Sequence, residues 1–171
     1  MEELKAEGIE CEYIWIGRDN IQGCISCYKC FDNRDKRCSQ TNDKLNEYFQ
    51  KMLDADGIIL GSPTYFADTS ARMKALIERA GMVSKANHSL LKHKLGASVV
   101  AVRRAGAAHV FSSINYFFLI SEMFVVGSSY WNLGVNPNVA VVSDYEKDKE
   151  GMKTFRDLGK NFAWLLKKIK A

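Results

Sequence analysis

A short apolar run bounded by glycines, residues 58–60, constrains the fold more than any other part of the sequence. The run is too brief for a helix and has no polar alternation, which is typical of a strand buried on both faces of a parallel sheet. Gly61-Ser62-Pro63 then ends the strand, because proline fixes φ and has no backbone N–H to donate. Apolar residues recur at helical spacing behind Ser70, a predicted N-cap. The sequence therefore predicts a turn at the carboxyl end of a strand, where ligands bind in open α/β sheets.

Two loops of this kind carry side chains suited to a ligand. The first presents Tyr65 and Phe66 directly after the strand, and two aromatic rings suit a flat ligand. The second follows another predicted buried strand at residues 97–102. It combines Arg103 and Arg104 with small residues, which let a ligand approach the backbone closely. An ordinary strand-to-helix connection and a loop with solvated arginines are the alternatives.

Four of the five cysteines lie in one loop between residues 17 and 40. Three thiols at two-residue gaps, with a fourth eight positions further on, can converge on one point, as iron–sulfur ligation requires. A tetrahedral zinc site also needs four ligands, although it prefers two separated pairs. A thiol-rich loop without metal is the third alternative. The four residues are Cys24, Cys27, Cys30 and Cys38, whereas Cys11 lies in a predicted strand and is expected to be a small buried hydrophobe.

The rest of the chain alternates predicted strands and helices, which predicts one domain, residues 1–171, with a doubly wound α/β sandwich. The predicted helix at residues 41–54 has one apolar stripe and two candidate caps, Thr41 and Asn42. The predicted helix at residues 110–124 is unusually aromatic, and so wide an apolar surface favours a subunit interface. Further predicted elements are a helix tail at 1–8 with Gly8 as its cap, strands at 9–16 and 125–127, a helix from Ser70 to about 81, and a final helix after residue 144.

Composition and charge narrow the class of function. The net charge of +4 is mild and the only dense basic run is at residues 167–170, so a nucleic-acid partner is not expected. The longest apolar stretch, at residues 116–126, is too short to cross a bilayer, so no membrane span is expected. Five cysteines without a visible signal peptide favour a reducing, cytoplasmic setting.

The motifs resemble those of a known family. Residues 55–66 (ADGIILGSPTYF), with residues 73–79 (MKALIER) behind them, resemble the NADPH-dependent FMN reductase and iron–sulfur flavoprotein branch of the flavodoxin-like proteins. The CxxCxxC loop and residues 103–107 (RRAGA) resemble the same family. The similarity runs through residues 127–132 to the final helix, and Glu78 stands where relatives often have Asp.

The resemblance implies a flavodoxin-like fold and FMN as the cofactor. In that family the turn matching the first loop wraps the isoalloxazine ring, and the loop matching the second lies along its other side. The four loop cysteines would hold a [4Fe–4S] cluster. The implied flavin-binding residues are Ser62, Pro63, Thr64, Tyr65 and Phe66 in the first loop, and Arg103, Arg104, Ala105, Gly106 and Ala107 in the second.

The implied activity is that of an FMN reductase or quinone-reductase-like oxidoreductase. Electrons from NAD(P)H or a reduced carrier would pass through the flavin to a quinone, flavin, metal or protein acceptor. No catalytic side chain is required, because the cofactor supplies the chemistry. The predicted assembly is a homodimer or homotetramer. Two alternatives stay open: an iron–sulfur electron-transfer protein that uses the loop from Cys24 to Cys38, and a scaffold of the same fold without a cofactor.

The start of the chain lacks one element of this fold. In a flavodoxin-like sheet of order 2-1-3-4-5, the predicted strand at 9–16 is strand 2 and that at 57–60 is strand 3. We expect the usual first strand, which belongs between them, and its phosphate-binding loop to be missing. Each buried backbone group orphaned in this way costs roughly 1–3 kcal/mol. We therefore expect the natural protein to carry about 25–35 residues upstream, which would make Met1 an internal methionine.

Overall fold

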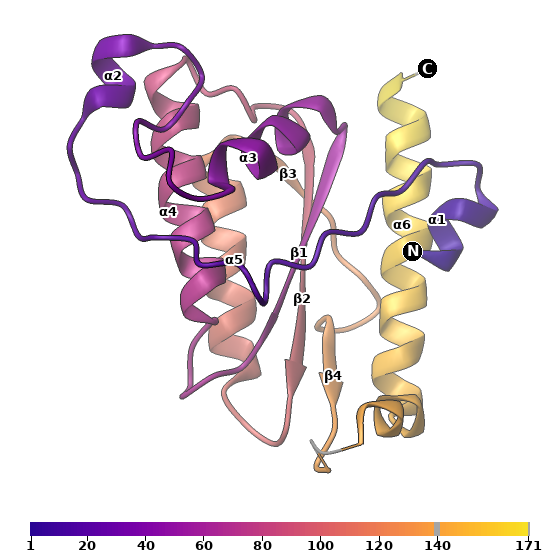
Figure 1. The fold of residues 1–171 in the computed structure, drawn as a ribbon. Coiled ribbons are helices and arrows are strands. Elements are labelled where there is room, and N and C mark those ends of the chain that lie inside the picture. Colours follow the sequence, from indigo (N-terminus) through magenta and orange to yellow (C-terminus); the bar gives the residue numbers. More distant parts are fainter. Residues whose placement is uncertain (139–140, 171) are drawn as a thin grey trace.

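The protein, described by a computed structural model over residues 1–138 and 141–170, is built on a parallel sheet (Figure 1). Its strands are β1 (Gly57–Pro63), β2 (Leu95–Val102), β3 (Phe124–Val125) and β4 (Leu133–Val135). They run in the order β1-β2-β3, and β4 pairs with the carboxyl half of β2. The two predicted buried strands are confirmed. Both are longer than predicted, because the β1 ladder against β2 continues through Ser62 and Pro63.

Helices cover both faces of the sheet, as the doubly wound fold requires (Figure 1). One layer consists of α3 (Leu45–Asp54), α4 (Ala71–Ala86) and α5 (Ala107–Ile120), and the other of α1 (Glu2–Ala6) and α6 (Lys149–Lys170). Each layer buries its own apolar cluster against the sheet. The larger cluster includes Phe49, Leu76 and Phe118, and the smaller one includes Leu4, Leu95 and Phe162.

Two glycines let an aromatic ring lie directly on the sheet. A Cβ added to Gly57 of β1 would lie 2.5 Å from the ring of Phe162, and one added to Gly96 of β2 would lie 2.6 Å from the ring of Phe118. Real Cβ atoms do not approach so closely, so both positions need glycine for packing. The two rings come from α6 and α5, on opposite faces of the sheet.

The predicted strand at residues 9–16 is wrong. This segment has no strand structure, although its side chains still pack on the two layers: Ile14 and Ile16 join the larger cluster, Ile9 and Cys11 the smaller. A strand forms only when a neighbour completes its hydrogen bonds. Among the described residues, no strand pairs with the edge of β1 that faces away from β2. Residues 9–16 therefore turn side chains alternately toward the two layers without forming backbone hydrogen bonds to a neighbouring strand in the described part of the chain.

Most predicted helices are confirmed, with shifted ends. Ser70 caps α4 by accepting from the Met73 N–H at 3.3 Å, and α4 continues to Ala86. The caps predicted for α3 are wrong, because the Asp43 carboxylate instead accepts from the Leu45 N–H at 3.1 Å. The sequence did not predict α2 (Lys29–Asn33), which lies in the cysteine loop, the 3₁₀ helix η1 (Val142–Lys147) or the short strand β4.

Candidate cofactor site

The turn that follows β1, here called the β1 turn (residues 64–69), is held by backbone hydrogen bonds. The Thr64 N–H donates to the Ala101 carbonyl at 2.8 Å and extends the ladder beyond the strand. Tyr65 and Asp68 exchange two backbone bonds, at 2.8 and 3.1 Å, which close the tip. The two residues between them have positive φ values of 48° and 71°, an uncommon conformation for side chains of this kind. The backbone of the tip is therefore fixed before any ligand binds.

The hydroxyl of Ser62 fastens the β1 turn to α4. It is buried, donates to the Pro63 carbonyl at 2.8 Å, and accepts from the Thr69 hydroxyl at 3.1 Å and the Ser70 N–H at 3.0 Å. One donor and two acceptor positions exhaust a serine hydroxyl. Ser62 thus supports the turn from inside.

The loop after β2, here called the β2 loop (residues 103–107), lies against the β1 turn. Gly106 has φ +89°, and a Cβ there would lie 3.1 Å from the Thr64 methyl group. His109, just beyond the loop on α5, lies 3.5 Å from the Asp68 carboxylate across the same junction. The structure therefore brings the two predicted ligand loops together at the carboxyl ends of β1 and β2. Within the β2 loop, Arg103, Arg104 and Ala105 are exposed, Gly106 is half-buried and Ala107 is buried.

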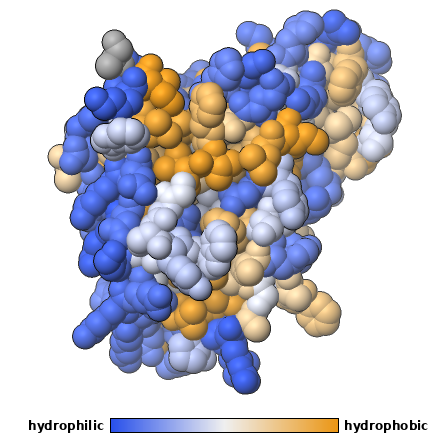
Figure 2. Space-filling model, turned by 180° about the vertical axis from the view of Figure 1, so that it is seen from behind, coloured by the Kyte–Doolittle hydropathy of each residue, from blue (hydrophilic) through white to orange (hydrophobic). Residues whose placement is uncertain are grey.

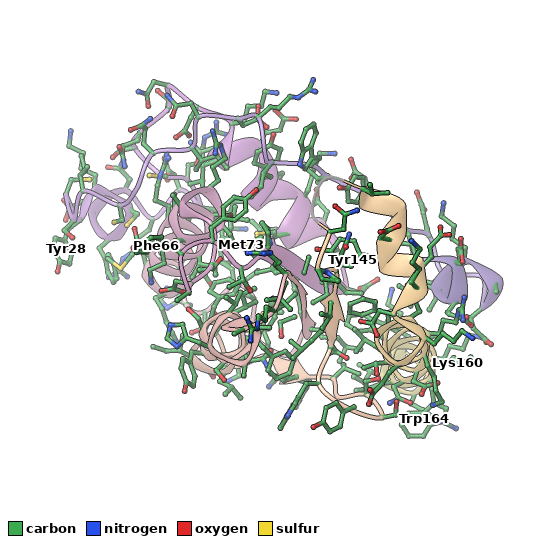
Figure 3. The ribbon with its side chains drawn as sticks, turned by 90° about the horizontal axis from the view of Figure 1, so that it is seen from below. Tyr28, Phe66, Met73, Tyr145, Lys160 and Trp164 are labelled. Carbon is green, nitrogen blue, oxygen red and sulfur yellow. The ribbon has the colours of Figure 1, made fainter. Side chains whose placement is uncertain are left out.

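The side chains of the β1 turn are arranged as a ligand would require. Figure 3 looks onto this end of the sheet, where Phe66 is labelled. Phe66 is fully exposed and Tyr65 is 63% exposed, so neither ring is used in the core. Thr64 Oγ1 is buried and has no hydrogen-bond partner among the described residues. Free aromatic faces beside an unpaired polar atom fit a flat ligand with polar edges, such as a flavin ring.

The four loop cysteines line one cavity, here called the cysteine pocket. Cys24, Cys27, Cys30 and Cys38 surround a space of about 20 Å³ beside α4. Among the described residues, no three His, Cys, Asp or Glu side chains converge on a point that would hold a single metal ion. Cys11 lies apart, half-buried against the α6 layer. Four cysteines are the donor type that iron–sulfur clusters use.

The thiols of the cysteine pocket differ in acidity. A hydrogen bond with the Ser39 hydroxyl, 3.4 Å from the sulfur, lowers the pKa of Cys27. Burial raises the pKa of Cys30. Because the thiolate is the form that binds metal, Cys27 on the exposed side is the more readily available ligand.

Side chains from two helices fix the backbone of the cysteine pocket. The Asn46 side chain accepts from the Cys38 N–H at 2.7 Å and donates to the Cys38 carbonyl at 2.9 Å. The Glu78 carboxylate accepts from the Cys24 N–H at 3.3 Å. The backbone at the first and last cysteines of the loop is therefore positioned from α3 and α4.

Sequence analysis missed Arg79, which is fully buried beside Cys38. A signal was present: Arg79 follows Leu76 by three residues and precedes Val83 by four, so it lies on the apolar face of α4. A charged residue on that face requires a partner within the fold.

Comparisons with known proteins identify the family and the fold. The family described as NADPH-dependent FMN reductase matches residues 1–137. An iron–sulfur flavoprotein of Methanocaldococcus jannaschii is 36% identical over 174 residues, which cover 98% of this chain and 86% of the relative. Among solved structures, RosB with the bound intermediate 8-demethyl-8-formylriboflavin-5'-phosphate has a TM-score of 0.68 at 18% identity, covering 98% of this chain and 69% of RosB.

A flavodoxin from the domain Archaea has a TM-score of 0.57 at 12% identity, covering 97% of this chain and 84% of that structure. At these identities the likeness to RosB and to the flavodoxin shows the fold alone, and it confirms the flavodoxin-like prediction. The match over residues 1–137 goes further, because it extends across both ligand loops and the cysteine pocket. The chain belongs to the NADPH-dependent FMN reductase family.

Proposed function

We propose that the protein is a flavin-dependent oxidoreductase that binds FMN between the β1 turn and the β2 loop and takes electrons from NAD(P)H. Family membership supports the flavin and the oxidoreductase class. The observation that carries the assignment is the contact between the two loops at Gly106 and Thr64, with Tyr65 and Phe66 exposed beside it. As one domain over residues 1–171, the chain would pass these electrons to a quinone, flavin, metal or protein acceptor.

The roles of the residues follow from their chemistry. When bound, FMN supplies the electron transfer, and the protein binds and orients it. Backbone groups of residues 64–66 would hydrogen-bond the ring edge, and the unpaired Thr64 hydroxyl would gain a partner. Arg103 or Arg104, exposed on the β2 loop, would stabilise negative charge on the reduced ring.

A second cofactor is proposed for the cysteine pocket. The four thiols line one cavity at the short spacings that iron–sulfur ligation uses, whereas a zinc site prefers two separated pairs of ligands. The relative from M. jannaschii bears the name iron–sulfur flavoprotein. A reducing, cytoplasmic setting fits free thiols. Separately, none of the helices described is both long and apolar enough to cross a bilayer.

Flavin binding followed by turnover tests the main proposal. Protein freed of flavin is titrated with FMN under anaerobic conditions, and the visible spectrum of bound flavin is followed. NADPH and NADH oxidation is then measured with quinone, flavin and ferric acceptors. Saturable binding with turnover of at least one donor supports the proposal, whereas a protein that remains colourless with excess FMN contradicts it.

Removing either exposed ring of the β1 turn is expected to weaken FMN binding. Tyr65→Ala and Phe66→Ala each lose a stacking surface, a loss of roughly 1–2 kcal/mol in binding free energy. Fluorescence titration with FMN measures the change in Kd. Tyr13→Ala, which removes an exposed ring from the segment at residues 9–16, is the control and should leave Kd unchanged. Wild-type affinity in both turn variants would exclude this turn as the ring site.

The outer face of α5 is proposed as a subunit interface. Figure 2 shows patches of hydrophobic surface on the side of the molecule opposite to that seen in Figure 1. On α5 and the adjoining β3, large exposed hydrophobic side chains follow one another: Tyr116, Leu119, Ile120, Phe124 and Val125. A patch of this kind usually marks an interface.

Replacing Ile120, which is 68% exposed, by glutamate is therefore expected to dissociate a homodimer or homotetramer. A buried unpaired carboxylate opposes the contact between subunits. Light scattering after gel filtration gives the mass. Trp164→Glu, an equally exposed site on α6, should leave the mass unchanged. A wild-type monomer at all concentrations would remove the proposed interface.

A further inference from the structure

Arg79 is the only charged residue of α4 that the helix buries completely. Its guanidinium makes four hydrogen bonds, three to residues of the cysteine loop and one to Asp43 just beyond it. Nε donates to the Cys38 sulfur at 3.2 Å, and one terminal nitrogen donates to the Gln40 carbonyl at 2.7 Å. The other donates to the Gln22 carbonyl at 3.2 Å and to the Asp43 carboxylate. A planar group with fixed donor directions is suited to such a task.

Asp43 balances this buried charge. Its side chain is 4% exposed and that of Arg79 is 0% exposed, so water screens neither. Burial alone would raise the pKa of Asp43, but the hydrogen bonds from Arg79 and from two backbone N–H groups outweigh it and hold that pKa below its ordinary value. The carboxylate is therefore ionised and neutralises the guanidinium at neutral pH. The pair can stay buried because each partner also makes further hydrogen bonds.

The four bonds of Arg79 close the cysteine loop from both sides. Gln22 and Gln40 flank the segment that contains all four loop cysteines, and Arg79 binds the backbone carbonyl of each. The remaining Nε–H donates to the sulfur of Cys38, the last of the four loop cysteines along the chain. An N–H that donates to a ligand sulfur changes the reduction potential of any cluster that this sulfur binds.

We propose that Arg79 is a positioning residue that holds Cys38 in place and raises the reduction potential of an iron–sulfur cluster in the cysteine pocket. This inference rests on the cluster proposed above. One-electron reduction breaks no bond and adds one negative charge to the cluster and its sulfur ligands. A donor N–H on one of those sulfurs stabilises the reduced state more than the oxidised state. Burial strengthens this hydrogen bond, because no water competes for it.

A redox titration of anaerobically reconstituted protein tests the inference, with dithionite as the electron donor and electron paramagnetic resonance as the readout. Arg79→Lys keeps the charge but lacks the planar fork, so it cannot bind the sulfur and both carbonyls together. The double variant Arg79→Gln, Asp43→Asn removes both charges and leaves neither one unpaired. We expect lower reduction potentials in both variants, because neither keeps the Nε–H on the Cys38 sulfur. Arg72→Lys, on the exposed side of α4, should match wild type.

The outcomes separate the inference from the proposed cluster. Wild-type protein that takes up no iron or sulfide overturns the cluster, and the role of Arg79 with it. Variants that retain iron at the wild-type potential overturn the role of Arg79 alone. If the variants fold but lose their iron, the positioning role is tested by the alkylation rate of Cys38 in cluster-free protein. An increase of roughly tenfold over wild type, equivalent to one lost hydrogen bond, supports positioning, and an unchanged rate refutes it.

Discussion

Replacing Cys38 by serine is expected to remove the iron from anaerobically reconstituted protein, whereas Cys11→Ser keeps the wild-type iron content. Cys38 is buried in the cysteine pocket and is held there by Arg79 and Asn46. A serine hydroxyl is not ionised at neutral pH and is a poor substitute for a thiolate ligand. Three thiols, one of them on the exposed Cys27, would then have to hold the cluster alone. Iron and acid-labile sulfide are measured per chain.

Cys11 is the matched control, because the same substitution is made at a half-buried thiol outside the cysteine pocket. Circular dichroism establishes that both variants fold. If the two variants hold equal amounts of iron, whether none or the full content, the assignment of ligands is wrong. The experiment has to exclude oxygen, since the exposed side of the pocket would lose its iron to air.

Phe162→Ala is expected to destabilise the fold by about 3–5 kcal/mol, the usual cost of deleting a buried phenylalanine ring. Phe162 is 2% exposed and lies against Gly57 at the start of β1. Because Gly57 has no side chain to fill the space, removal of the ring leaves a cavity between α6 and the sheet. Urea unfolding followed by circular dichroism gives the free energy of unfolding and its change.

Trp164→Ala is the control for this measurement. Trp164 lies two residues further along α6 and is 63% exposed, and Figure 3 shows it pointing away from the sheet. Although the deleted ring is larger, we expect a change within about 0.5 kcal/mol, as for other surface substitutions. Equal losses in the two variants would contradict the stabilising role assigned to burial of Phe162 against Gly57.

The parts of the fold that sequence analysis predicted are those with local causes. Residues 58–60 lie in a strand because they form a short apolar run, but the strand continues through Gly61-Ser62-Pro63, which was predicted to end it. Ser70 caps the next helix through its own side chain. The two ligand loops could be found because each follows such a strand. The strand predicted at residues 9–16 failed because strand formation depends on a neighbour, which the alternation of side chains does not supply.

The cysteine pocket shows the same limit. The spacing of Cys24, Cys27, Cys30 and Cys38 predicted that they could converge on one point. The four line one cavity, but among the described residues no three of their thiols converge closely enough to hold a metal ion. The contact between Arg79 and Cys38 joins residues 41 positions apart, and no spacing rule predicts it. The buried Arg79 could have been noticed as a charge on an apolar helix face, but its partner Asp43 is identified only by the fold.

The helix α4 also sets the relation between the two sites, since it carries Ser70 at the β1 turn and Arg79 at the cysteine pocket. Nine residues at a rise of 1.5 Å place these two points about 13 Å apart along a rigid rod. In such a helix, each added residue changes both the distance between the two points and the direction in which Arg79 leaves the helix. Inserting one residue between them would turn Arg79 by about 100° away from the loop, whereas seven inserted residues would nearly restore its face but lengthen the rod by about 10 Å. The number of residues between Ser70 and Arg79 is thus a spacing constraint on any electron exchange between the two sites.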